Sequence, residues 1–143
     1  MYYTAVQSVV VRAEDKDKYK KLEDLKGLKI GVQKSSIQED MPKKQIPDAQ
    51  LKQLSKLPDL MQELKNKRVD AVVAELPVAQ SFISKNKDLV IGEPKPVDET
   101  GGSAIAFKKG SGQLVDEVNK TIDKLAADKK IEQFVTDANL LVE

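Results

Sequence analysis

The sequence predicts an α/β fold: an open, mostly parallel sheet flanked by helices, followed by a C-terminal strand and helices. Short β-branched runs alternate with stretches of helical periodicity, in the order strand, helix, strand, helix, strand, helix, strand. Residues 69–74, VDAVVA, are apolar almost without interruption, which is typical of a strand covered by helices on both faces. Repeated strand–helix–strand units of this kind form a parallel sheet, here of about four or five strands.

The first expected strand spans residues 3–12, where β-branched side chains are frequent. An exposed charged loop and a short helical turn, LEDL, follow it, and Gly27 ends that turn. The second strand is expected at residues 28–33. A helix then begins at about Ile37, and Pro42 lies late enough in it to shorten or kink it.

The third strand is expected at residues 50–54, and the VDAVVA run at residues 69–74 is the fourth. Pro77 stands where the first turn of a helix tolerates proline, so a helix opens there and leads to a fifth strand at residues 88–92. The helix between the third and fourth strands is marked by apolar residues at i, i+3, i+4 and i+7, which are Leu57, Leu60, Met61 and Leu64.

The C-terminal part follows a Pro- and Gly-containing linker at about residues 94–102. A strand is expected at residues 103–108, SAIAFK, and two helices come after it. One side of these helices is apolar and requires a partner surface. Its residues are Leu114, Val118, Ile122 and Leu125 in the first helix and Ile131, Phe134 and Val135 in the second.

The composition excludes several classes of function. The chain has neither histidine nor cysteine, so disulfides, thiolate metal sites, cysteine nucleophiles and Ser-His-Asp triads are impossible within it. No calcium-loop motif is present, and we expect no cofactor. The net charge is +1, aromatic residues make up 4% of the chain, and its lysines are interleaved with acidic residues, so nothing indicates nucleic-acid binding.

Two polar features follow expected strands, where open α/β sheets bind ligands. The turn KSSIQ offers the backbone amides of Ser36, Ile37 and Gln38 at the start of a helix, which suits an anion. Glu75, after the VVA run, offers a carboxylate, which suits a cation. Together they describe a receptor for a zwitterion, for which an amino acid is the natural candidate.

Both features also have a purely structural explanation. Ser36 and Glu39 form the pattern S-x-x-E, a capping box that stabilises a helix start without any ligand. Glu75 by itself is compatible with a solvent-exposed end of a strand. A phosphate-binding loop is a weaker interpretation, because the turn lacks a glycine-rich run and a GK[ST] motif.

Three segments in order along the chain carry a family resemblance. LEDLKGLKIGVQKSSIQE is similar to the pattern DLKGKKVGVQxGTxQE, VDAVVAELPVA to VDAVVxDxPVA, and SAIAFKKGSGQLVDEVNKTIDKL to a closing strand, KGS turn and helix. These segments resemble the extracytoplasmic amino-acid-binding proteins of ABC transporters, solute-binding protein family 3. The resemblance extends over essentially the whole chain.

The resemblance implies a lobe of the type II periplasmic-binding-protein fold, in which two α/β lobes joined by two crossing strands close like a hinge. Residues 1–7, with Tyr3 and Gln7, are then the first hinge crossing, and residues 8–95 are the second lobe. Residues 96–102, with Val97, are the second crossing, and residues 103–143 return to the first lobe. We expect the larger N-terminal portion of the first lobe, and a signal or lipid-anchor segment, to lie outside this sequence.

The resemblance also implies roles for individual residues. Ser36 stands where the family usually has a threonine that donates to the ligand carboxylate, the Ile37 amide is a second donor, and Gln38 faces the ligand. Glu75 stands where an aspartate commonly grips the α-ammonium group. Ser35 replaces the usual glycine, so a left-handed backbone there is expected to be strained.

The family's first lobe supplies an arginine for the ligand carboxylate and aromatic residues around its side chain. Arg12 and Arg68 are not placed for that role, so we expect this half of the clamp to bind weakly. A soluble fragment should also cover its apolar C-terminal helices by dimerisation, segment exchange or refolding onto its own sheet.

The resemblance therefore predicts the substrate-binding component of an ABC importer for polar, possibly basic, amino acids, and not an enzyme. Its expected partners are a free amino acid and the permease subunits in the membrane, with no nucleic acid. Its expected location is extracytoplasmic, either periplasmic or lipid-anchored to the outer face of the cell membrane. Two alternatives stay open: the effector domain of a LysR-type transcription regulator, and an enzyme of the same fold such as a cyclohexadienyl dehydratase.

Overall fold

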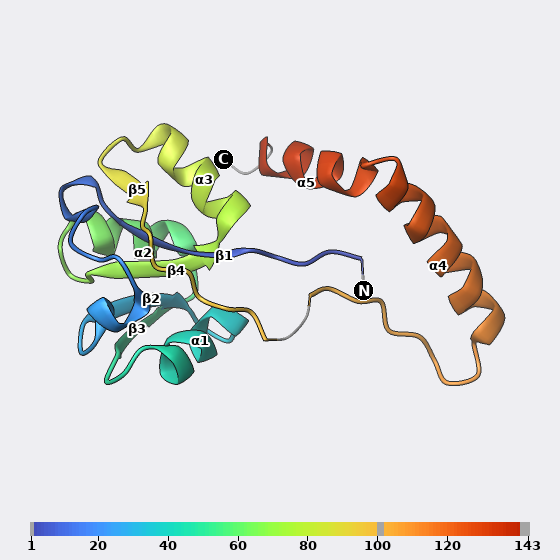
Figure 1. The fold of residues 1–143 in the computed structure, drawn as a ribbon, viewed down its shortest axis with the longest axis horizontal. Helices are drawn as coiled ribbons and strands as arrows, with labels where there is room; N and C mark the ends of the chain where they lie inside the picture. Colours follow the sequence, from blue (N-terminus) through green and yellow to red (C-terminus); the bar gives the residue numbers. More distant parts are fainter. Residues whose placement is uncertain (1, 100–101, 141–143) are drawn as a thin grey trace. The chain divides into compact units, whose positions relative to one another are not determined.

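The computed structural model describes residues 2–99 and 102–140 of the chain (Figure 1). It divides into two compact units: residues 6–98 form one, and the other combines the segment up to Ala5 with the segment from Glu99 onward. The chain therefore passes between the units at two places. Among the described residues, no helix is both long enough and apolar enough to cross a membrane.

The unit of residues 6–98 is built on a five-stranded sheet with the order β3-β2-β4-β1-β5. β1 is antiparallel to both of its neighbours, β4 and β5, whereas β2 is parallel to β3 and β4. Every strand except β1 therefore runs in the same direction, and the expected open, mostly parallel sheet is confirmed. The strands are β1 (Gln7–Arg12), β2 (Lys29–Gln33), β3 (Gln50–Leu54), β4 (Ala71–Glu75) and β5 (Leu89–Ile91).

Helices cover both faces of this sheet (Figure 1). α1 (Ile37–Gln45) packs on one face through Met41, and α2 (Leu57–Lys65) and α3 (Leu76–Lys85) pack on the other. Two short 3-10 helices, η1 (Ala13–Asp15) and η2 (Leu22–Leu25), lie between β1 and β2. The first face buries Val9, Val11, Ile30, Val32 and Val73, and the second buries Val10, Leu60, Leu64, Val72 and Ala74.

Gly31, in the middle of β2, lets α2 approach the sheet closely. A Cβ atom at this position would lie 3.0 Å from Cγ2 of Val72 and 3.1 Å from Cδ2 of Leu60. A side chain at this position would therefore crowd Val72 and Leu60, which would have to shift to accommodate it. The amphipathic pattern that predicts α2 is confirmed, since Leu60, Met61 and Leu64 are all buried.

Two sequence-based expectations need correction. β1 begins at Gln7 instead of residue 3, because Tyr3 forms only an isolated bridge, with Ser103. Residues 103–108 are not a strand, since within their own unit that bridge is the only strand pairing described. Pro42 lies inside α1, as expected, and the helix continues past it to Gln45, with the carbonyl of Pro42 accepting from the amide of Ile46.

The second unit contains the two expected helices, α4 (Gly112–Ala127) and α5 (Lys130–Leu140). Lys129 separates them in a left-handed conformation, with a φ of 54°. No residue of α4 is buried, and Leu114 and Phe134 on the apolar side are 56% and 55% exposed. The other apolar residues of these two helices that the sequence analysis singles out are partly buried, so this side is covered only in part.

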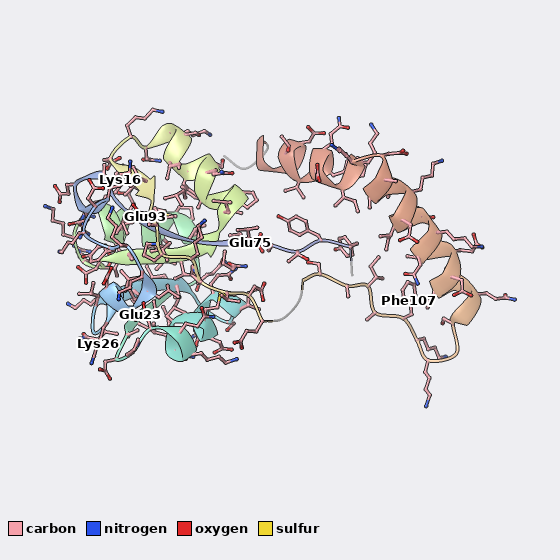
Figure 2. The ribbon with its side chains drawn as sticks, viewed as in Figure 1. Lys16, Glu23, Lys26, Glu75, Glu93 and Phe107 are labelled. Carbon is pink, nitrogen blue, oxygen red and sulfur yellow. The ribbon has the colours of Figure 1, made fainter. Side chains whose placement is uncertain are left out.

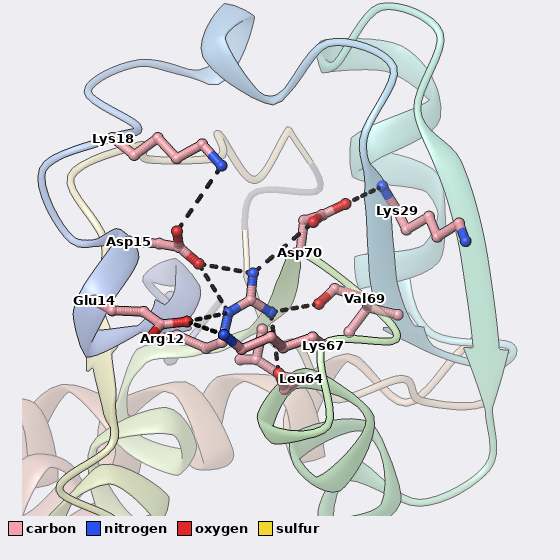
Figure 3. A network of polar contacts seen from close by, with 9 residues as sticks. All are labelled: Arg12, Glu14, Asp15, Lys18, Lys29, Leu64, Lys67, Val69 and Asp70. Atoms are coloured by element: carbon pink, nitrogen blue, oxygen red, sulfur yellow. Dashed lines mark hydrogen bonds and ion pairs between the residues drawn. The ribbon is translucent and has the colours of Figure 1, made fainter.

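Arg12 ties together one end of the sheet (Figure 3). Its guanidinium group donates to the carbonyl oxygens of Leu64, at 3.0 Å, and Val69, at 2.8 Å, beside the C-terminus of α2. It also forms a two-bond ion pair with Asp15, at 2.7 and 2.8 Å, and lies 3.9 Å from Asp70. Arg12 is only 8% exposed, so these contacts replace most of its hydration.

Replacing this arginine should strongly destabilise the unit of residues 6–98. Arg12→Met leaves two buried carbonyls and the Asp15 carboxylate without their donor, which costs about 2–4 kcal/mol of unfolding free energy. Urea denaturation followed by circular dichroism measures the change. Arg68→Met is the control, because the Arg68 side chain is 68% exposed in its ion pair with Glu63 and its loss should cost less than about 1 kcal/mol. Equal losses in the two variants would contradict a structural role for Arg12.

Candidate functional site

A pocket of about 140 Å³ lies at the carboxyl ends of β2 and β4. Gln33 is the last residue of β2 and Glu75 the last residue of β4, so both expected strand ends meet here. Figure 2 labels Glu75 where β4 passes into α3. The complete lining is Gln33, Gln38, Leu57, Val73, Ala74, Glu75 and Val78.

The turn between β2 and α1 is held by local hydrogen bonds. Ser35 has a φ of 60°, which confirms the expected left-handed backbone at a position where serine is less suited than glycine. The Ser36 hydroxyl donates to the carbonyl oxygen of Gln33 at 2.7 Å. The backbone amide of Ser35 donates to Oε2 of Glu39 at 2.9 Å.

The expected capping box does not form in its usual register. Ser36 is the N-cap residue of α1, but its side chain accepts no capping bond because its hydroxyl is turned back to Gln33. Glu39 does reach back, yet to the amide of Ser35 rather than to that of Ser36. One half of the capping box is therefore displaced by one residue, to the left-handed Ser35, and the other half is absent. The turn is nevertheless anchored on both sides of Ser36.

The negative charge of Glu39 is paired with neighbouring side chains, which weakens its repulsion of an anion in the pocket. Its carboxylate accepts from Nζ of Lys43 at 2.8 Å and from Nε2 of Gln53 at 2.8 Å. The Lys43 hydrogen bond, followed by that of the Ser35 amide, lowers the pKa of Glu39 below its usual value. The Glu39 amide donates to the Ser36 carbonyl at 3.1 Å, and the amides of Ile37 and Gln38 before it stay available to a ligand.

Gln38, in the first turn of α1, reaches across to the sheet. Its side-chain Nε2 donates to Oε1 of Gln7, the first residue of β1, at 3.0 Å. Gln7 lies directly opposite Glu75 in the antiparallel pairing of β1 with β4, so their side chains project from the same face of the sheet. Three polar side chains from α1, β1 and β4 therefore meet at this end of the sheet.

Glu75 is half-buried and is both the last residue of β4 and the N-cap of α3. Its carboxylate has no hydrogen bond or ion pair to another residue that the structure describes. A half-buried carboxylate in this state attracts a cationic group, because water solvates only part of it. Within residues 2–99 and 102–140, acidic side chains form no group of three that could hold a metal ion.

The five expected ligand-binding residues divide into two groups. Gln38 and Glu75 line the pocket, whereas Ser35, Ser36 and Ile37 belong to the adjoining turn and helix start and do not line it. Sequence reasoning overlooked Gln33, Leu57 and Val78. Gln33 ends a strand, whereas Leu57 and Val78 lie at helix starts that follow strands. Gln33 and Val78 adjoin the two strand ends that the sequence analysis singles out, and applying the strand-end rule to β3 as well would have found Leu57.

The three expected hinge residues lie at or near the passages between the units. Tyr3 pairs with Ser103 through a hydrogen bond from the Ser103 amide to the Tyr3 carbonyl, at 2.7 Å. Val97 is held by the side chain of Gln45, which accepts from its amide at 2.9 Å and donates to its carbonyl at 2.7 Å. Gln7 belongs to β1 and contacts the pocket residue Gln38. That these residues act as hinges stays a prediction.

Comparison with known proteins finds relatives that are described as amino-acid-binding proteins. The chain is 37% identical over 139 residues to the arginine-binding extracellular protein ArtP of Bacillus subtilis, which covers 94% of this chain and 52% of that protein. It is 32% identical over 128 residues to a probable histidine-binding protein of Campylobacter jejuni, with 89% and 49% covered. The chain thus spans about half the length of these curated relatives. No family model matches the chain.

Solved structures agree in fold as well as in sequence. A crystal structure of an amino acid ABC transporter substrate-binding protein, AbpA from Streptococcus pneumoniae, bound to L-arginine, matches with a TM-score of 0.82 and 38% identity. The match covers 96% of this chain and 58% of that one. An ancestral arginine-binding protein bound to glutamine matches with a TM-score of 0.71 and 34% identity, covering 92% and 58%.

The anchoring of the turn predicts a pH dependence. Because the pKa of Glu39 is lowered in the folded chain, its carboxylate stabilises the fold above the usual carboxyl range. This contribution is lost as the pH falls through the folded pKa. Lys43→Met should move the pKa of Glu39 back toward its usual value, as measured by carbon-detected NMR titration. Lys44→Met, on the same helix, should leave it unchanged, and equal effects of the two variants would argue against the Lys43 contact.

Proposed function

Since the chain is a homologue of the substrate-binding proteins of amino-acid ABC transporters and matches about half of their length, we propose that it is the second-lobe portion of such a protein. In this proposal it binds a free amino acid by lobe closure and performs no bond chemistry. The observation that carries the proposal is the pocket in which Gln38 and Glu75 meet at the strand ends.

The ligand's two charged groups would be held by different elements. Glu75 would accept from a cationic group, since its carboxylate is half-buried and pairs with no other described residue. The amides of Ile37 and Gln38 would donate to the carboxylate at the start of α1. The Ser36 hydroxyl is committed to Gln33, so it would join these donors only after rotating away from that carbonyl.

The size of the pocket supports lobe closure. At about 140 Å³ it is smaller than the roughly 300–1,000 Å³ of typical ligand sites. A second surface therefore has to complete the enclosure and exclude water from the ligand's charges. In the proposal this surface is the other lobe, and the passages near Tyr3, Gln7 and Val97 are the hinge crossings.

The substrate class we propose is polar and preferably basic amino acids. The relatives and solved neighbours named above are described as binding arginine, histidine or glutamine. The unpaired carboxylate of Glu75 suits the α-ammonium group that all of these ligands carry. The permease subunits are the proposed partners and an extracytoplasmic location the proposed setting, with a lipid anchor and self-association through α4 and α5 as further parts of the proposal.

The two alternatives have less support. None of the relatives named above is described as a transcription regulator, so nothing favours the LysR-type alternative. A further solved neighbour, 28% identical with a TM-score of 0.72, is described as an ancestral amino-acid-binding protein and a precursor of cyclohexadienyl dehydratase. That description places binding before catalysis, and we propose binding for this chain too.

The test is binding of L-arginine to the 143-residue chain. Titration monitored by nitrogen–proton NMR should give saturable shifts at the amides of Ile37 and Gln38 and at Glu75. Glu75→Gln should weaken the affinity by about tenfold to a hundredfold, because it removes one charge-assisted hydrogen bond.

Glu23→Gln is the matched control, because Glu23 is an exposed glutamate on η2, away from the lining of the pocket (Figure 2). It should leave the L-arginine titration unchanged. Saturable shifts absent from the pocket residues, or equal affinities for the two variants, would refute the proposed site.

A further inference from the structure

The pocket at the carboxyl ends of β2 and β4 carries a single charge. Glu75 is the one charged residue in its lining, and the two other polar residues there, Gln33 and Gln38, are neutral. In the proposed function Glu75 holds the α-ammonium group of an amino acid. A cationic side-chain end, such as a guanidinium group, would need a second carboxylate to replace its hydration. The residues that line the pocket provide none.

The acidic side chains in the first turn of α1 are committed to other partners. The carboxylate of Glu39 accepts from Nζ of Lys43 and from Nε2 of Gln53, both at 2.8 Å. The carboxylate of Asp40 lies 3.3 Å from the same Nζ atom. Neither acidic residue belongs to the lining of the pocket. They therefore do not replace the missing second carboxylate.

Gln33 supports the wall of the pocket instead of adding a charge to it. Its side-chain Nε2 donates to the carbonyl oxygen of Ser55 at 3.1 Å. The next backbone amide, that of Lys34, donates to the carbonyl oxygen of Leu54 at 2.9 Å. A carbonyl oxygen only accepts, so the nitrogen of the Gln33 amide is the atom turned to Ser55. These two bonds hold the turn between β3 and α2, and Leu57 is the first residue after that turn to line the pocket.

The remainder of the lining is apolar. Leu57 and Val78 are half-buried in the first turns of α2 and α3, and Val73 and Ala74 are buried in β4. The hydrophobic effect has no direction, so such a wall contacts the carbon atoms of a ligand without selecting one polar side-chain end over another.

The volume of the pocket suits the head group of an amino acid better than a long side chain. At about 140 Å³ it has less than half of the roughly 300 Å³ at the lower end of typical ligand sites. The α-ammonium group lies at Glu75 in the proposed function, and the carboxylate lies at the amides of Ile37 and Gln38. With both groups in place, a long side chain has to leave the pocket.

We propose that the unit of residues 6–98 recognises the α-ammonium and α-carboxylate groups that all amino acids share, and does not select among their side chains. Leu57 and Val78 contact the first carbon atoms of the ligand. Selection of a polar or basic side chain then comes from the surface that completes the enclosure. This inference rests on the proposed function and divides its recognition into two parts, of which this unit supplies the general one.

The first experiment titrates the 143-residue chain with four compounds and follows the amide signals of Ile37 and Gln38 by nitrogen–proton NMR. Salt at about 0.15 M screens the long-range attraction of the arginine charge. L-Arginine and L-alanine should then bind with affinities within about fivefold of each other. Agmatine lacks the carboxylate and Nα-acetyl-L-arginine lacks the α-ammonium group, so each should bind at least about tenfold more weakly than L-arginine.

The pattern of the four affinities separates the two proposals. A larger preference for L-arginine over L-alanine, or a smaller loss for either derivative, would overturn the inference and leave the proposed function standing. Absence of saturable shifts with all four compounds would refute the proposed function, and head-group recognition with it.

The second experiment adds the charge that the pocket lacks. Leu57→Glu places a carboxylate on the apolar wall, in the first turn of a helix, where the helix dipole favours it. It should raise the ratio of L-arginine affinity to L-alanine affinity by about tenfold, because a second carboxylate can pair with the guanidinium group. Gln62→Glu is the matched control, since it adds the same charge at an exposed position of the same helix and should leave the ratio unchanged.

Val78→Glu serves in place of Leu57→Glu if that variant does not fold. An unchanged ratio in the folded variant, or an equal rise in Gln62→Glu, would overturn the inference. Either result would mean that the missing second carboxylate is not the reason why this unit accepts any side chain.

Discussion

The buried guanidinium group of Arg12 is the interaction on which the arrangement of the main unit depends. It joins the end of β1 to the C-terminus of α2 and to the turn that leads into β4 (Figure 3). Because β1 and β4 are antiparallel, Arg12 and Gln7 stand at opposite ends of the same strand pair. Arg12 thus stabilises the pairing at the end remote from the pocket, and that pairing places Gln7 across from Glu75 at the other end.

Because β1 runs against the other strands, residues from the start of one strand and from the ends of others meet beside the pocket. In a wholly parallel sheet only the carboxyl ends of strands would meet at this edge. Here the amino end of β1 joins the carboxyl ends of β2 and β4, so a side chain from the start of the unit lies beside side chains far along the chain. Binding chemistry at this edge is therefore shared by strands of opposite direction, one of which leads directly to a passage between the two units.

The sequence could predict whatever depends on local pattern. Periodicity located α2 and the C-terminal helices, and the strand-end rule led to Gln38 and Glu75, which the structure brings to one pocket. The expected strand at residues 103–108 was wrong because a strand depends on a partner that no local pattern reveals. The place of Gln7 beside the pocket was hidden for the same reason. The displaced cap of α1 depends on the left-handed backbone of Ser35. The spacing of Ser36 and Glu39 in the sequence cannot predict that Glu39 binds the amide of Ser35.

Gln45 fastens the last turn of α1 to the chain at Val97. Its side chain bonds both the amide and the carbonyl of Val97, so it pairs with the backbone as a neighbouring strand would. The opposite end of the same nine-residue helix carries the turn of Ser35 and Ser36. α1 thus connects a prospective ligand contact at its first turn with the chain at Val97, next to a passage between the units, at its last. Under the proposed lobe closure, a tilt of α1 at the ligand would reach that passage.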